Sequence, residues 1–194
     1  MELEQVLTEL ETFGSENDSV KTEYAQRMMN IPREVGKFLQ MLVMNGRAKR
    51  ILEIGTSNGY STLWLARGAR LVGGEVTTVD LSPYKIGLAR TNFERAGMSD
   101  IIIQVQASGG DFLQRAADEC YDFIFLDSAR SEYSAWWPNV KRVLKPGGLC
   151  VTDNAISHKH DLETFFALVE ADPEFATSLV PIGNGEYLAV KSIK

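Results

Sequence analysis

The sequence predicts a doubly wound α/β domain built on a mostly parallel sheet. Short apolar segments alternate with helical patterns from residue 50 onward, and these segments are rich in Ile, Val and Leu and bounded by Gly or Asp. Strands that are buried on both faces of a parallel sheet have this composition. The 194 residues are 44% hydrophobic, which suits one domain, 1–194, with one sizeable core.

The first 48 residues are predicted to form helices that cap the sheet edge or the pocket, ahead of an α/β core at 49–194. Pro32 and Gly46 mark the start and stop of the last of these helices. The polar stretch 14–19 is interpreted as a connector. The amphipathic pattern of these helices is also compatible with a homodimer. The helical segments are 3–13, 20–29 and 33–45.

Seven strands are expected in the remainder of the chain. The last two flank the turn-forming stretch 182–186 without a helix between them, so we expect an antiparallel β-hairpin at the C-terminus. Helices fill the gaps between the earlier strands. The predicted strands are 50–54, 75–79, 101–105, 121–126, 149–152, 175–180 and 187–190.

Composition restricts the function classes. The formal net charge is -6, so no basic face is expected for nucleic acid or an anionic membrane. No stretch approaches the roughly 20 apolar residues that span a bilayer, which favours a cytoplasmic protein. Cys120 and Cys150 lie in apolar segments without a Cys-x-x-Cys pair, so we expect two reduced core thiols.

A glycine-rich loop follows the first strand directly. Gly55-Thr56-Ser57-Asn58-Gly59 lies between that strand and a helix, where glycine permits tight turns and free amides face a docking ligand. Asp80 ends the second strand, and its carboxylate can accept hydrogen bonds from ribose hydroxyls. These features predict a cofactor that contains adenosine.

The loop departs from the dinucleotide fingerprint Gly-x-Gly-x-x-Gly. Ser57 and Tyr60 stand where that fingerprint requires glycine. Glu53, just before the loop, would repel a diphosphate but suits the ammonium and sulfonium of S-adenosylmethionine. The alternative for Glu53 is a carboxylate that simply binds loop amides.

Two aspartates and an asparagine form a second candidate site. Asp127 ends the fourth strand, and Asp153 and Asn154 end the fifth, at the sheet edge where ligands bind in doubly wound folds. Their oxygens suit Mg²⁺ or another divalent cation. The alternative is that Asp127 serves the substrate or a helix cap and that Asp153-Asn154 form a turn.

The run 51–61, Ile-Leu-Glu-Ile-Gly-Thr-Ser-Asn-Gly-Tyr-Ser, resembles motif I of the cation-dependent O-methyltransferases, which include catechol and caffeoyl-coenzyme A O-methyltransferases. The likeness extends from about Ile31 to the C-terminus. It implies a Rossmann-like methyltransferase fold that transfers a methyl group from S-adenosylmethionine to a hydroxyl of a small aromatic acceptor. It places the cofactor's amino acid along Glu53, Gly55 and Ser61, its ribose on Asp80 and its adenine near Ser108. The predicted contact set is completed by Thr56, Ser57, Gly59, Tyr60, Leu81 and Asp127.

The same resemblance identifies residues 125–127 and 152–154 as the family's two metal-binding motifs. Family members of this type usually carry a lysine, the assigned general base, three residues after the first metal aspartate. This chain has Arg130, which stays protonated and can only anchor a carboxylate or stabilise a phenolate. His158 is therefore the best candidate base, with a surface histidine at a helix start as the alternative, and His160 is weaker.

Aromatic and sulfur side chains are expected near the acceptor: Met28, Met29, Tyr133, Trp136 and Trp137. The alternative for the two tryptophans is core packing. Three other functions stay open at this point. They are a metal-independent small-molecule methyltransferase, a non-catalytic S-adenosylmethionine-binding protein and, last, a nucleotide-dependent dehydrogenase.

Overall fold

A computed structural model describes residues 2–193. Its helices and strands alternate from β1 onward, as the apolar periodicity predicts. In chain order the elements are α1 (Leu3–Val20), η1 (Tyr24–Gln26), α2 (Arg33–Asn45), β1 (Arg50–Ile54), α3 (Tyr60–Val72), β2 (Glu75–Asp80), α4 (Pro83–Arg95), β3 (Ile102–Gln106), α5 (Gly109–Arg115), β4 (Tyr121–Leu126), η2 (Arg130–Glu132), α6 (Tyr133–Val143), β5 (Leu144–Thr152), α7 (Lys159–Glu170), β6 (Phe175–Val180) and β7 (Glu186–Lys191).

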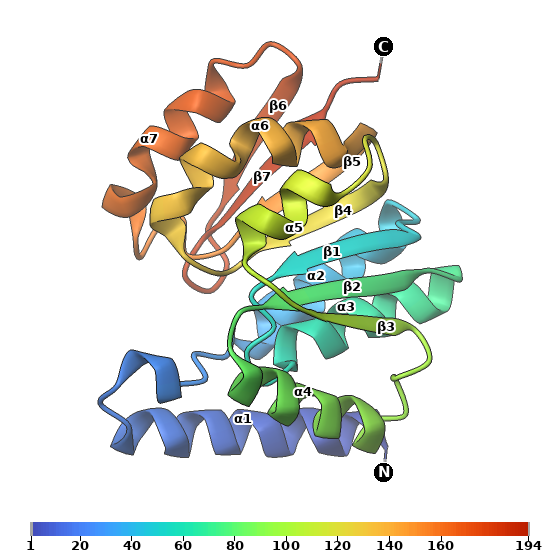
Figure 1. The fold of residues 1–194 in the computed structure, drawn as a ribbon, viewed down its shortest axis with the longest axis vertical. Coiled ribbons are helices and arrows are strands. Elements are labelled where there is room, and N and C mark those ends of the chain that lie inside the picture. The colour runs from blue at the N-terminus through green and yellow to red at the C-terminus, as the bar shows by residue number, and fades with distance from the viewer. Residues whose placement is uncertain (1, 194) are drawn as a thin grey trace.

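One twisted sheet organises the molecule (Figure 1). Within the described residues it has seven strands in the order β3-β2-β1-β4-β5-β7-β6. The first five strands in this order are parallel to one another, whereas β7 runs antiparallel to both β5 and β6. The predicted fold class and C-terminal hairpin are therefore confirmed. The strand order reverses between β1 and β4, and this switch point is where such sheets bind ligands.

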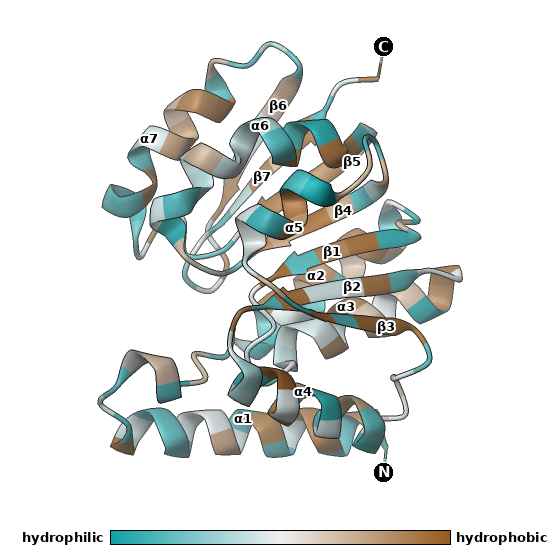
Figure 2. Ribbon diagram, in the orientation of Figure 1, coloured by the Kyte–Doolittle hydropathy of each residue, from teal (hydrophilic) through white to brown (hydrophobic). Residues whose placement is uncertain are grey.

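Helices cover both faces of the sheet because successive strand residues point to opposite sides. Ile51 packs in a core with α1, α2, α3 and α4, while the next residue, Leu52, packs in a second core with α5, α6 and α7. Figure 2 shows hydrophobic residues gathered on β1, β3 and β4 and hydrophilic ones along α5. The double burial explains the near-continuous apolar runs in the strands.

The N-terminal region differs from the prediction. Residues 14–20 are the last turns of α1, and 21–29 contain only the short η1. Gly14 is buried, and a Cβ there would lie 2.5 Å from Asn30 Nδ2, so the glycine serves close packing. The polar side chain of Asp18 accepts hydrogen bonds from the amides of Met28 and Met29, both at 2.7 Å. Polarity here serves tertiary hydrogen bonds instead of a loop.

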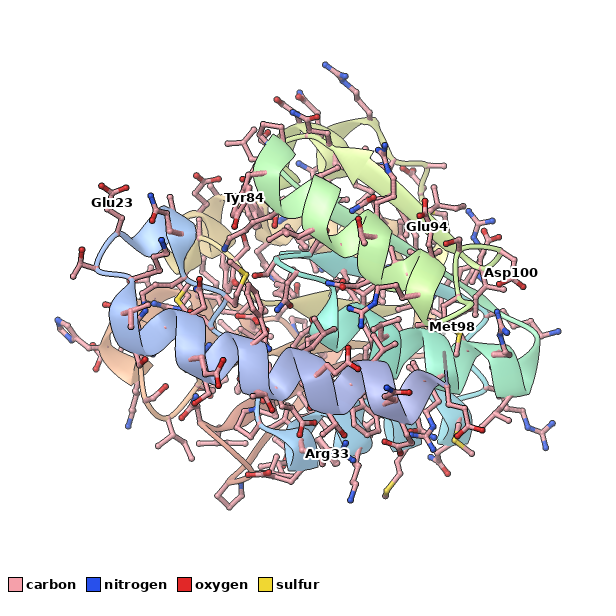
Figure 3. All side chains as sticks on the ribbon, turned by 90° about the horizontal axis from the view of Figure 1, so that it is seen from below. Glu23, Arg33, Tyr84, Glu94, Met98 and Asp100 are labelled. Carbon is pink, nitrogen blue, oxygen red and sulfur yellow. The ribbon has the colours of Figure 1, made fainter. Side chains whose placement is uncertain are left out.

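Helix α1 packs against α3 and α4. The view from below shows α1 and α4 side by side (Figure 3). Arg67 Nη1 is 2.7 Å from Glu4 Oε1, and the Tyr60 hydroxyl donates to Glu11 Oε1 at 2.5 Å. Among residues 2–48, only the segment 27–31 lines the main cavity described below. The helices support that segment from outside.

Smaller differences concern strand limits and the cysteines. Strand β5 begins at Leu144, five residues before the predicted start, because Leu144 pairs with Tyr121 of β4. Both cysteines are free thiols, Cys150 buried and Cys120 half-buried. None of the helices within residues 2–193 has the length and apolarity to cross a membrane.

Candidate functional site

A cavity of about 540 Å³ opens at the carboxyl ends of β1 and β4. It brings together residues predicted separately for cofactor, metal and catalysis. The predicted residues that line it are Gly55, Thr56, Ser57, Tyr60, Ser61, Asp80, Asp127, Arg130, Asp153, Asn154 and His158.

The loop after β1 requires glycine at its first position. Gly55 has φ +115°, and a Cβ there would lie 1.9 Å from the carbonyl oxygen of Asp127. The amide of Gly55 donates to Val79 O of β2 at 2.9 Å. The backbones that follow β1 and β4 therefore cross in close contact, which places the loop directly beside Asp127.

Asp80 holds the loop in shape. Its Oδ2 accepts a hydrogen bond from the Ser57 amide at 2.9 Å, and its Oδ1 accepts one from the Ser82 amide at 2.8 Å. Ser57 also donates through Oγ to Met28 O at 2.8 Å, so the loop is tied to the N-terminal segment. Asp80 therefore fixes the conformation of the loop, and it also lines the cavity.

Glu53 lies beneath the loop and is fully buried. Its carboxylate accepts hydrogen bonds from the hydroxyls of Ser61 and Thr78, both at 2.6 Å, and of Thr62. Burial raises the pKa of Glu53 from 4.5 to about 7, although these three hydroxyls oppose the rise. The partners are hydroxyls, not the loop amides of the alternative interpretation.

Four predicted cofactor residues do not line the cavity: Glu53, Gly59, Leu81 and Ser108. Gly59 has φ +88°, and a Cβ there would meet the Phe93 ring at 2.4 Å, so this glycine lets α3 pack on α4. Ser108 caps α5 by accepting a hydrogen bond from the Asp111 amide at 3.1 Å. Leu81 is 68% exposed.

Asp127, Asp153 and Asn154 do converge at the cavity, as predicted. Burial, and then the negative charges of Asp153 and Glu53, hold the pKa of Asp127 well above its usual range. Asp153 is buried, and its carboxyl group is hydrogen-bonded to the carboxyl of Glu186. Two buried carboxyl groups that repel one another, Asp127 and Asp153, form a donor set that fits a cation.

The donor set is two carboxylates and one amide. No three His, Cys, Asp or Glu side chains between residues 2 and 193 gather as a charged metal cage would. Mg²⁺ takes few ligands from protein and fills its remaining octahedral positions with water or substrate. The set therefore fits Mg²⁺ better than a cation that needs a full protein cage.

Glu186, at the start of β7, is a third buried carboxyl that sequence reasoning missed. Its exposed fraction is 0%, and its carboxyl group is hydrogen-bonded to that of Asp153. Burial, followed by the charge of Asp153, raises its pKa far above the usual range. The hairpin prediction placed Glu186 in a turn, and only the pairing of β7 with β5 reveals its neighbour.

His158 and Arg130 lie in the same cavity. The exposed His158 ring is 2.9 Å through Nδ1 from Ser157 Oγ, which lies 3.2 Å from Asn154 Oδ1. This chain of contacts connects the histidine with the predicted metal set. His160 points elsewhere, with its side chain 95% exposed.

The prediction that Tyr133, Trp136 and Trp137 lie at the acceptor pocket is wrong. Tyr133 is buried and its hydroxyl accepts a hydrogen bond from the Ser128 amide at 2.6 Å. Trp136 packs over Gly109 and Gly110, and Trp137 packs on Phe165 with ring centroids 5.8 Å apart. These three rings are buried in the core between α6, α5 and α7. Of the predicted group, Met28 and Met29 alone line the cavity.

Other lining residues were missed by sequence reasoning. Arg27 and Asn30 lie in a segment that was expected to be partly helical, Lys85 in the first turn of α4, and Asn184 in the hairpin turn. Asn184 O accepts hydrogen bonds from two amides of the segment after β5, which brings the hairpin to the cavity. The turn-forming sequence signalled a hairpin but not this contact.

Comparison with known proteins gives concordant results. A family model described as O-methyltransferase matches residues 2–192. A catechol O-methyltransferase of Mycobacterium tuberculosis is 36% identical over 126 residues, which cover 65% of this chain and 57% of that protein. A catechol O-methyltransferase of Niastella koreensis is 39% identical over 127 residues, which cover 62% of this chain and 56% of that protein. The matches thus span little more than half the length of these relatives.

A solved structure of an O-methyltransferase from Bacillus cereus in complex with SAH is similar over almost the whole fold. Its TM-score is 0.81 at 26% sequence identity, and the alignment covers 97% of this chain and 91% of that one.

Proposed function

Because the chain belongs to the O-methyltransferase family, we propose that it transfers a methyl group from S-adenosylmethionine to a hydroxyl of a small acceptor with the help of a divalent cation. One observation carries the proposal. The loop 55–58 and the set Asp127, Asp153 and Asn154 line one continuous cavity, so a cofactor on the loop and an acceptor at the acidic set would share it.

The cofactor end of the cavity fits a cationic amino acid attached to adenosine. Asp80 offers carboxylate oxygens where a ribose would lie, and the loop has the permissive backbone that close ligand approach requires. Glu53 adds negative charge beneath the loop. The family relation and the structure with SAH from Bacillus cereus support this assignment.

The acceptor end fits Mg²⁺ held by Asp127, Asp153 and Asn154. Such an ion, when bound, lowers the pKa of a coordinated hydroxyl and fixes its position. Asp153 is itself positioned by a hydrogen bond from Asn154 Nδ2 to its Oδ2 at 2.6 Å. Asn154 adopts φ +66°, a left-handed conformation that a short polar residue tolerates.

Transfer forms a bond between the acceptor oxygen and the methyl carbon and breaks the bond from that carbon to sulfur, which keeps the electron pair. The acceptor must also lose a proton. Arg130 stays protonated and cannot take it. His158 lines the cavity and contacts Ser157 through Nδ1, which leaves Nε2 for the proton.

The test is an assay of S-adenosylhomocysteine formation with a panel of catechols, phenols and hydroxy acids, run with Mg²⁺ and again with EDTA. We expect turnover that chelation abolishes and Mg²⁺ restores. Turnover that survives EDTA would assign the chain to metal-independent methyl transfer. Tight S-adenosylmethionine binding without turnover on any acceptor would instead favour a non-catalytic binding protein.

A further inference from the structure

Two arginines line the cavity: Arg130 beside the acidic set, and Arg27 in the segment that contacts the loop, where its charge also acts on Asp18. Arg27 comes from the segment before α2, and Arg130 begins η2, so the fold brings together residues more than half the chain apart. The positive charge of Arg130 acts on both Asp127 and Asp153, which places its guanidinium beside the acidic set. In a protein of net charge -6, two guanidinium groups that line one cavity call for an explanation.

The donors of these arginines are not fully used by the protein. The Nε atoms of Arg27 and Arg130 are both buried without a hydrogen-bond partner in the described part of the chain. The carboxylate facing Arg130 Nε is Asp161, whose Oδ2 lies 3.6 Å away on a side chain that is 54% exposed. That separation is too long for a hydrogen bond. A buried donor without a partner is costly, so a bound ligand is the natural acceptor.

The tryptophans of α6 give the cavity no stacking surface, and its other charged and polar lining residues include Lys85, Asn30 and Asn184. The side chains of Tyr133, Trp136 and Trp137 are committed to the core, so no tryptophan is available to stack on a planar acceptor. Met28 and Met29 add apolar surface without direction. Charge and hydrogen bonding are therefore the specific signals that the cavity offers to an acceptor.

We infer that the acceptor carries a carboxylate in addition to the hydroxyl that is methylated, and that Arg27 and Arg130 hold this carboxylate. The inference rests on the proposed function and names its substrate class, a hydroxy acid. A guanidinium presents a planar fork of N–H donors that matches a carboxylate, whereas a neutral diphenol would leave these donors unpaired.

One other anion competes for the same donors. S-adenosylmethionine has a carboxylate of its own, and Arg27 lies next to Met28, whose carbonyl accepts the hydrogen bond from Ser57 of the loop. The experiment must therefore measure cofactor and acceptor affinity separately.

The test is calorimetric titration of the protein, with S-adenosylhomocysteine and Mg²⁺ present, by 3,4-dihydroxybenzoate and by its neutral analogue 3,4-dihydroxybenzamide. We expect the acid to bind at least about tenfold more tightly, because a charge-assisted pair that replaces a neutral one contributes that much. Arg27→Gln and Arg130→Gln should each remove most of this preference. Asp161→Asn should increase it, since it removes the competing carboxylate. Arg90→Gln, an exposed arginine on α4, is the matched control.

Equal affinity for the acid and the amide, or no binding of the acid, would overturn the inference. So would a loss of S-adenosylhomocysteine affinity in Arg27→Gln with the acid preference unchanged, because Arg27 would then hold the cofactor. Failure of the proposed function is distinct: it would appear as absent turnover with every acceptor, neutral catechols included.

Discussion

Replacement of Glu53 by glutamine tests how the buried carboxyl beneath the loop is held. Glutamine has nearly the same shape, but it lacks the charge and presents an NH2 group, a donor, in place of one of the carboxylate oxygens that accept from the three hydroxyls around it. The Thr78 hydroxyl can reverse its direction because Thr56 Oγ1 lies 2.6 Å from it and can act as donor or acceptor. The variant should therefore fold.

The expected effect follows from the pKa of Glu53, which burial raises from 4.5 to about 7. A carboxyl with a raised pKa binds its proton more tightly in the folded state than in the unfolded state. Its contribution to stability is complete below pH 4.5, declines as the pH rises and is lost above about pH 7. The difference between the pKa of 4.5 in the unfolded state and that of about 7 in the folded state corresponds to about 3 kcal/mol of unfolding free energy.

The assay is urea denaturation of the wild type and Glu53→Gln across the range from about pH 5 to pH 8. The stability of the wild type relative to the variant should fall by most of that amount as the pH rises, while other titrating groups cancel in the difference. Glu34→Gln, on the exposed side of α2, is the control. A difference that is constant within about 0.5 kcal/mol would refute the reasoning, since surface changes have effects of that size.

Three further predictions use other contacts. Gly55→Ala should lower the free energy of unfolding by more than about 3 kcal/mol in chemical denaturation, because its Cβ would meet a carbonyl oxygen at 1.9 Å and its φ is +115°. The control is Gly87→Ala on α4, where a Cβ has open space within 4 Å. It should raise the free energy of unfolding by up to about 1 kcal/mol. Equal effects of the two would contradict the loop geometry. Asp18→Ala removes the acceptor of two amides at 2.7 Å and should cost about 2 kcal/mol, with weaker S-adenosylhomocysteine binding in calorimetry; unchanged affinity would separate this segment from the cofactor. His158→Ala should lower turnover by about 100-fold or more at constant cofactor affinity, and unchanged turnover would exclude it as the base.

The sequence was sufficient for features that depend on local pattern. Strand periodicity predicted the parallel sheet and its hairpin, and the position of Gly55 directly after β1 predicted a tight glycine-dependent loop between a strand and a helix. Asp127 and Asp153 were predicted to converge because adjacent parallel strands end at one sheet edge.

Features that depend on contacts between distant parts of the chain could not be predicted from the sequence. The polar stretch 14–19 resembled a loop, but its side chains bind the returning chain while the backbone stays helical. Trp136 and Trp137 have aromatic chemistry suited to a pocket, yet helix packing directs them into the core. Arg27 and Glu186 carry no local signal, because each acquires its role from a neighbour far away in sequence.

The central claim is that one cavity holds both the cofactor and a cation-bound acceptor. The measurement that tests it most directly is a crystal structure of the chain soaked with S-adenosylhomocysteine and Mg²⁺. We predict the cofactor along residues 55–58 with its ribose at Asp80, and ion density between Asp127, Asp153 and Asn154. Cofactor bound elsewhere, or no density at this acidic set under saturating Mg²⁺, would contradict the account.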